Sequence, residues 1–85
     1  MRNRRDQIPA LVLATVVLVY EAAQGRTQPW YVDRDKLSRD SVPDDLDGAI
    51  YYAELSGWLV GSGEPPKGVA ITEDGVRLLE ELGLI

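Results

Sequence analysis

The second half of the chain carries the pattern that most constrains its fold. Apolar and small side chains recur at three- and four-residue spacing up to Gly57, which indicates a helix that ends there. The apolar runs at 58–60 and 69–71 predict two strands. The Gly/Pro-rich segment 61–68 between them predicts a turn. Thr72 is a typical helix N-cap residue, so we expect a closing helix after it.

Size and composition limit the chemistry of this chain. Its 85 residues, 45% of them hydrophobic, predict one globular domain with a small core. Cysteine and histidine are both absent, which excludes disulfides and the usual zinc ligands. No nucleophile lies at a recognisable spacing from a base. The aspartates do not have the spacing of a calcium loop. We therefore expect a non-enzymatic protein without a cofactor or a metal site; the clustered aspartates are Asp40, Asp44, Asp45 and Asp47.

Charge is distributed unevenly along the chain. Residues 1–39 hold seven basic and four acidic side chains, a net charge of +3. Residues 40–85 hold two basic and ten acidic side chains, a net charge of −8. Because nucleic-acid affinity depends largely on neutralising phosphates, the acidic half disfavours DNA or RNA as its ligand. Such a surface favours solubility or a basic protein partner.

The segment from residue 8 to residue 24 is apolar on nearly all sides. Pro9 suits the first turn of a helix, and Gly25 suits its end. A helix that faces water has a polar side, so we expect the outer side of this helix to pack against a second copy of the chain. The alternatives are a helix central to its own domain or a buried strand. The residues of the expected homodimer seam are Leu11, Val12, Val16 and Val19.

The start of the chain also resembles a secretory signal. Residues 1–7 are polar and basic and predict a flexible arm, and an apolar run follows them. That run has about 13 residues, which is too short to cross a bilayer. Its removal would also delete the first expected helix. We therefore expect a cytoplasmic protein that does not enter a membrane. The alternative is a secreted or tethered protein whose mature chain lacks residues 1–24.

The middle of the chain predicts two further helices within a single domain, residues 8–85. Asp33 can cap a short helix that runs through Ser38 and is buried by Leu37. Pro43 suits the first turn of the next helix. Trp30 and Tyr31 predict either a short strand or a plug at the edge of the core. The inward face of the helix after Pro43 comprises Leu46, Ala49, Ile50 and Ala53.

Two stretches of the sequence resemble the winged helix-turn-helix superfamily, particularly the small prokaryotic multiple-antibiotic-resistance and phenolic-acid regulators. Residues 53–60, Ala-Glu-Leu-Ser-Gly-Trp-Leu-Val, match the end of the third helix and the first strand of the wing in those proteins. Residues 71–79, Ile-Thr-Glu-Asp-Gly-Val-Arg-Leu-Leu, match the exit from the wing. The similarity covers about residues 33–82. It implies an α+β fold with three to four helices and a small antiparallel β-hairpin wing.

The same resemblance identifies the positions that normally face DNA, and none of them is basic here. They are Asp47, Gly48, Tyr51, Tyr52 and Leu55. Regulators generally place cationic or amide side chains there to contact bases and phosphates. Tyrosine and tryptophan are instead enriched at protein interfaces. We therefore expect a module for protein–protein interaction or homodimerisation. Its candidate partner-binding residues are Tyr51, Tyr52, Leu55 and Trp58, unless the short second helix and the N-terminal segment cover them.

A DNA-binding transcriptional regulator is the alternative function, because most winged helices belong to that class. It requires the basic side chains outside the third helix to line one side of the molecule. The wing contributes a single cation, Lys67, beside Glu64. The complete candidate set for nucleic-acid binding is Arg2, Arg4, Arg5, Arg34, Lys36, Arg39 and Lys67.

Overall fold

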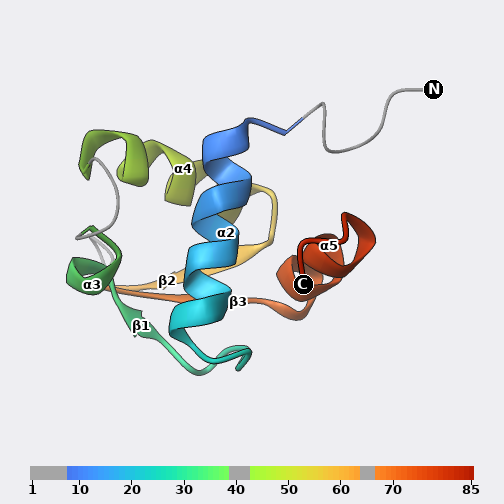
Figure 1. The fold of residues 1–85 in the computed structure, drawn as a ribbon. Helices are drawn as coiled ribbons and strands as arrows, with labels where there is room; N and C mark the ends of the chain where they lie inside the picture. The colour runs from blue at the N-terminus through green and yellow to red at the C-terminus, as the bar shows by residue number, and fades with distance from the viewer. Residues whose placement is uncertain (1–7, 39–42, 64–66) are drawn as a thin grey trace.

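The protein has an α+β architecture in the computed structural model, which describes residues 8–38, 43–63 and 67–85 (Figure 1). The described residues form four helices and three strands, labelled as in Figure 1. In chain order they are α2 (Ala10–Ala22), β1 (Val32–Asp33), α3 (Arg34–Ser38), α4 (Pro43–Leu55), β2 (Leu59–Ser62), β3 (Gly68–Ile71) and α5 (Glu73–Glu81).

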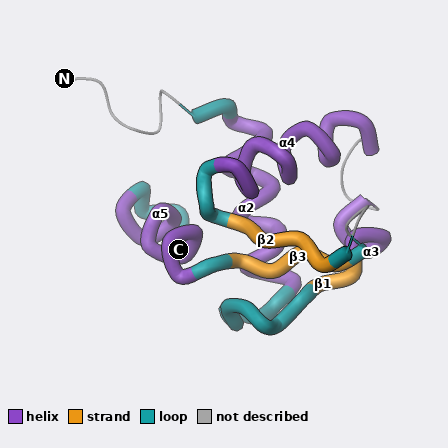
Figure 2. Tube along the Cα trace, turned by 180° about the vertical axis from the view of Figure 1, so that it is seen from behind, coloured by secondary structure: helices purple, strands orange, loops and turns teal. Residues whose placement is uncertain are grey.

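The three strands form one antiparallel sheet in the order β1-β3-β2 (Figure 2). The β2–β3 hairpin pairs Leu59 with Ile71 and Ser62 with Gly68, and β1 adds Val32 opposite Val69. Helix α2 lies against one face of the sheet, with α4 and α5 on its two sides (Figures 1 and 2). This arrangement brings α4 beside β2.

The predicted first strand begins one residue too early, at residue 58, and the predicted turn at 61–68 is too long. Strand β2 continues through Gly61 and Ser62, and β3 begins at Gly68. Glycine and serine favour turns when isolated, but hydrogen bonding to the opposite strand stabilises their extended conformation here. The hairpin is therefore longer than the sequence predicts.

Helix α2 places three of the four predicted seam residues in the core of its own chain. Of the four predicted seam residues, Val12, Val16 and Val19 are at most 4% exposed within a single chain, whereas Leu11 is 42% exposed. The helix packs against α4, β3 and α5, so the chain itself covers most of its apolar circumference. The outer side of the helix is also apolar: Leu11 and Ala14 are exposed, and Val17 and Leu18 are partly buried. Three of the four predicted seam residues are thus unavailable to a second copy.

We expect Val16→Ala to destabilise the protein by about 2 kcal/mol, because it removes two buried methyl groups and leaves a cavity. Leu11→Ala, on the same helix, is expected to change stability by less than about 0.5 kcal/mol. Urea unfolding followed by circular dichroism measures both values. A larger loss for Leu11→Ala than for Val16→Ala, with a midpoint that depends on protein concentration, would restore a seam through this helix.

Thr72 anchors the start of α5 to the turn that follows α4. Its Oγ1 accepts a hydrogen bond from the Gly75 N–H at 3.0 Å, which confirms the predicted N-cap. The same hydroxyl donates to the Gly57 carbonyl at 2.6 Å, and the backbone N–H of Thr72 donates to the Trp58 carbonyl at 3.0 Å. The closing helix therefore holds the end of α4 and the start of β2 together.

The segment before α3 agrees with the sequence at its cap and differs at its aromatics. Asp33 Oδ1 accepts from the Asp35 N–H at 2.9 Å, and Leu37 is buried, as predicted. Trp30 and Tyr31 lie just before β1 and are both exposed, so they form neither a strand nor a plug. The Arg26 guanidinium lies over the Trp30 ring, 4.2 Å from its centre, and forms a cation–π interaction with it.

Candidate functional site

Helix α4 has one face in the core and the opposite face in solvent. Its inward side is formed by the predicted residues, all buried: Leu46, Ala49, Ile50 and Ala53. On the other side Tyr51 is 64%, Tyr52 39% and Leu55 72% exposed. We call Tyr51, Tyr52 and Leu55 the α4 patch. Among the described residues, neither α3 nor the N-terminal segment covers it.

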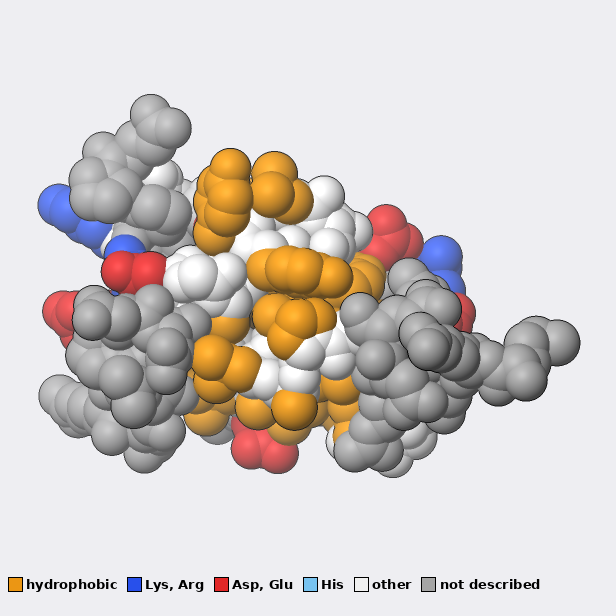
Figure 3. All heavy atoms as spheres, turned by 90° about the horizontal axis from the view of Figure 1, so that it is seen from above, with side chains coloured by type: hydrophobic (Ala, Val, Ile, Leu, Met, Phe, Trp, Pro, Cys, Tyr) orange, Lys and Arg blue, Asp and Glu red, His pale blue; other side chains and the backbone are white. Residues whose placement is uncertain are grey.

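The end of the molecule that carries α4 has a largely apolar surface. Seen from this side, hydrophobic side chains gather in the middle, with charged side chains at the left and right edges and acidic side chains also at the lower edge (Figure 3). The large exposed hydrophobic residues of the two helices at this end are Leu11 of α2 and the three residues of the α4 patch. An exposed apolar surface with a charged rim is typical of protein interaction sites.

Trp58 belongs to the core and not to the patch, which corrects the predicted binding set. It is 7% exposed and follows Gly57, whose φ of +82° reverses the chain at the end of α4. Its backbone N–H donates to the Ala53 carbonyl at 2.9 Å, which directs the chain back toward the sheet. The Trp58 ring lies 6.2 Å from the Tyr52 ring, centre to centre. Trp58 therefore supports Tyr52 from inside.

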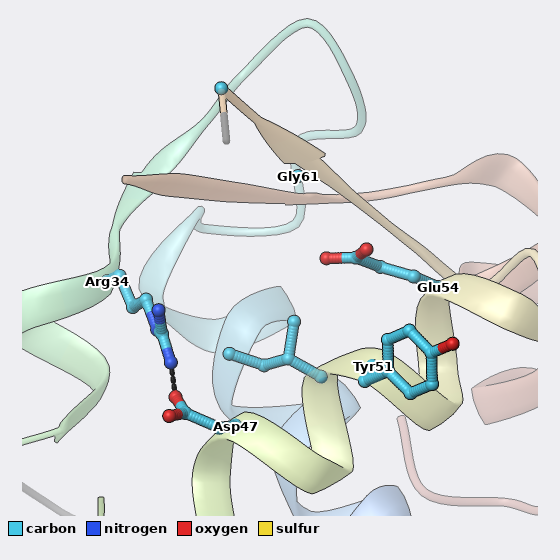
Figure 4. Close-up of a pocket in the computed structure, with 7 residues that line it drawn as sticks. Arg34, Asp47, Tyr51, Glu54 and Gly61 are labelled. Carbon is cyan, nitrogen blue, oxygen red and sulfur yellow. Dashed lines mark ion pairs between the residues drawn. The ribbon is translucent and has the colours of Figure 1, made fainter. Parts of the chain in front are cut away.

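A pocket of about 490 Å³ lies between α4 and the β2–β3 hairpin, next to the α4 patch (Figure 4). We call it the α4 pocket. Tyr51 belongs to both the pocket and the patch, so the two are continuous. Its lining residues are Arg34, Asp47, Ile50, Tyr51, Glu54, Gly61 and Gly63.

The α4 pocket contains two carboxylates and one guanidinium. Arg34, at the start of α3, forms an ion pair with Asp47 on one wall (Figure 4). Glu54 extends into the pocket from the end of α4 nearer the hairpin. Its Oε1 is shielded from solvent, and no described residue donates a hydrogen bond to it. A shielded carboxylate oxygen without a donor is uncommon in folded proteins.

Of the three described basic side chains in the set for DNA binding, Arg34 and Lys67 lie among acidic ones. Arg34 is engaged by Asp47. Arg34 and Lys67 also border a second hollow whose other two lining residues are Asp33 and Asp35. Lys36 is exposed on α3. The remaining members of the predicted set lie outside the described residues: Arg2, Arg4 and Arg5 of the arm, and Arg39.

Neither a metal-binding cluster nor a membrane span is found in the described ranges. Among the side chains that the structure describes, those of residues 8–37, 46–63 and 67–85, no three acidic groups come together closely enough to hold a metal ion. No helix in the described ranges combines the length and apolarity needed to cross a bilayer. The pocket and the patch on α4 are accordingly the site on which we base a function.

Comparison with family models, with curated proteins and with solved structures finds no match to this chain.

Glu54 is a site residue that sequence reasoning misses. Its position seven residues after Asp47 and three after Tyr51 indicates a shared side of the helix. That spacing alone does not reveal the hairpin, which supplies the opposite wall of the pocket.

Proposed function

We propose that this chain is a winged-helix, non-enzymatic module that binds another protein through the α4 patch. The element order supports the winged-helix assignment: a helix, a strand, two helices, a hairpin and a closing helix. The pairing of β1 with β3, the second strand of the hairpin, supports it further. In this arrangement α4 takes the place of the helix that regulators insert into the DNA groove.

The exposure of the α4 patch is the observation that supports a protein ligand most strongly. Two tyrosines and a leucine face solvent on a helix that has no basic residue and four acidic ones. Inserting this helix into a groove would bring carboxylates toward phosphates and would release no counterions. Burying the same rings against a protein would remove apolar surface from water, which is favourable.

Charge favours a basic protein over a second copy of this chain. A symmetric dimer formed by the α4 patch would place the same surface of both copies in contact, including the Asp47 and Glu54 carboxylates. Like charges that face each other across an interface are unfavourable. A partner with apolar side chains flanked by arginine or lysine would match both the patch and its acidic border.

Photocrosslinking from the patch tests this function. Benzoylphenylalanine replaces Leu55, which is exposed in the patch, and in a control chain it replaces Glu80, which is exposed on α5. In cells that express the chain we expect a discrete protein adduct from position 55 that position 80 does not give. A nucleic-acid adduct from position 55, or the same adducts from both positions, would contradict the proposal.

A further inference from the structure

Glu54 is the pocket residue whose carboxylate lacks a hydrogen-bond donor among the described residues. Its carboxylate enters the α4 pocket, and Oε1 is shielded from water without a donor among the described residues. An ionised carboxylate has about four acceptor positions. A rotation of the Glu54 side chain that turns Oε1 toward the pocket would let a ligand with N–H donors pair with this carboxylate and fill the space beside it.

The other charged residues of the pocket cannot supply that donor without losing their own partner. Arg34 is directed to Asp47, on the other side of the pocket from Glu54 (Figure 4). The lining residues therefore contribute one guanidinium and two carboxylates, so the negative charge of Glu54 is not balanced within the pocket. Electrostatic complementarity then requires a cation and disfavours phosphate or any other anion.

The walls of the pocket suit a planar cation on an extended side chain. The Tyr51 ring borders the space, and guanidinium groups stack on aromatic faces. Gly61 and Gly63 form the hairpin side and present no side chains. The guanidinium fork can also donate two hydrogen bonds to one carboxylate, whereas an ammonium group cannot match this geometry. The pocket volume of about 490 Å³ is sufficient for such a side chain.

We propose that the α4 pocket binds an arginine side chain of the partner protein, whose guanidinium pairs with the Glu54 carboxylate beside the Tyr51 ring. This inference rests on the proposed function, because it names the chemistry of the partner that the adjoining α4 patch binds. The arginine anchors the partner in the pocket while its apolar residues cover the patch.

Capped amino acids test the pocket without knowledge of the partner. Nα-acetylarginine amide is titrated into the ¹⁵N-labelled protein, and the Gly61 and Gly63 amide resonances report binding. Nα-acetylcitrulline amide has nearly the same shape without the charge. We expect arginine to bind with a dissociation constant on the order of 1 mM, the range for so small a ligand. Citrulline should bind at least about 10-fold more weakly, since it lacks the charge-assisted hydrogen bonds.

Two variants assign the effect to Glu54. Glu54→Gln should reduce arginine binding to the level of citrulline, whereas Glu80→Gln removes the same charge from α5 and should leave it unchanged. Equal shifts with arginine and citrulline, or undiminished arginine binding by Glu54→Gln, would overturn the inference. That failure is distinct from failure of the proposed function: a chain that crosslinks a protein from position 55 but shows no arginine preference keeps its patch and loses only the anchor.

Discussion

Gly75→Ala is expected to destabilise the protein by about 3 kcal/mol or more, because its new methyl group has no space. A Cβ at this position would lie 2.3 Å from the Trp58 carbonyl oxygen and 2.7 Å from Ile71 Cγ1. Gly75 is in the first turn of α5, where its N–H is bound by Thr72. Because the Trp58 contact is to backbone, relief requires α5 to move away from β2 and β3. A domain of this size should then melt about 12 °C lower or more.

Gly48→Ala is the matched control for that substitution. Gly48 is exposed within α4, and a Cβ there has nothing within 4 Å. Alanine favours the helix over glycine, so this variant should gain about 0.5–1 kcal/mol. Thermal unfolding of the two variants beside the wild type measures both effects. Equal stability of the two variants would mean that α5 does not pack on the hairpin as described.

Tyr51→Ala is expected to weaken binding of the protein crosslinked at position 55 by about 2 kcal/mol, or about 30-fold in dissociation constant. Tyr51 contributes a large ring to the patch and one wall to the pocket, so it lies where both parts of the interface meet. Because the residue is largely exposed, the loss should appear in affinity and not in the free energy of unfolding. Isothermal titration calorimetry of purified partner against both chains measures the change.

Tyr31→Ala is the control for this prediction, since Tyr31 is an exposed tyrosine that lies outside α4. It should bind the partner within about 2-fold of the wild type. If Tyr31→Ala weakens binding as much as Tyr51→Ala does, the partner contacts the region before β1, and the patch is not the centre of the interface.

The sequence predicts those parts of the fold that local chemistry determines. The caps at Asp33 and Thr72 and the buried face of α4 depend on side chains close together in the chain, and the structure confirms them. The environment of α2 depends on which elements cover it. A helix apolar on all sides does not indicate which of its residues face the core, so only the tertiary packing shows that Val12, Val16 and Val19 are buried within the chain.

The candidate site is predictable to a similar extent. Helical spacing places Tyr51, Tyr52 and Leu55 on one side, but it cannot determine whether other elements cover them. Trp58 follows the helix in sequence, yet the turn at Gly57 takes it into the core. The pocket around Glu54 requires the hairpin to return beside α4, which is a long-range contact that no local pattern contains.

The proposed function holds that the α4 surface binds a protein and does not bind DNA. Titration of labelled mixed-sequence duplex DNA at low salt tests it most directly. Low salt maximises the electrostatic attraction between proteins and phosphates, so it gives DNA binding its best opportunity. We expect no saturable change in fluorescence anisotropy up to protein concentrations of about 10 µM, which lies within the range of about 1–100 µM for nonspecific dissociation constants at physiological salt. Submicromolar binding that weakens steeply as salt is added would contradict the account.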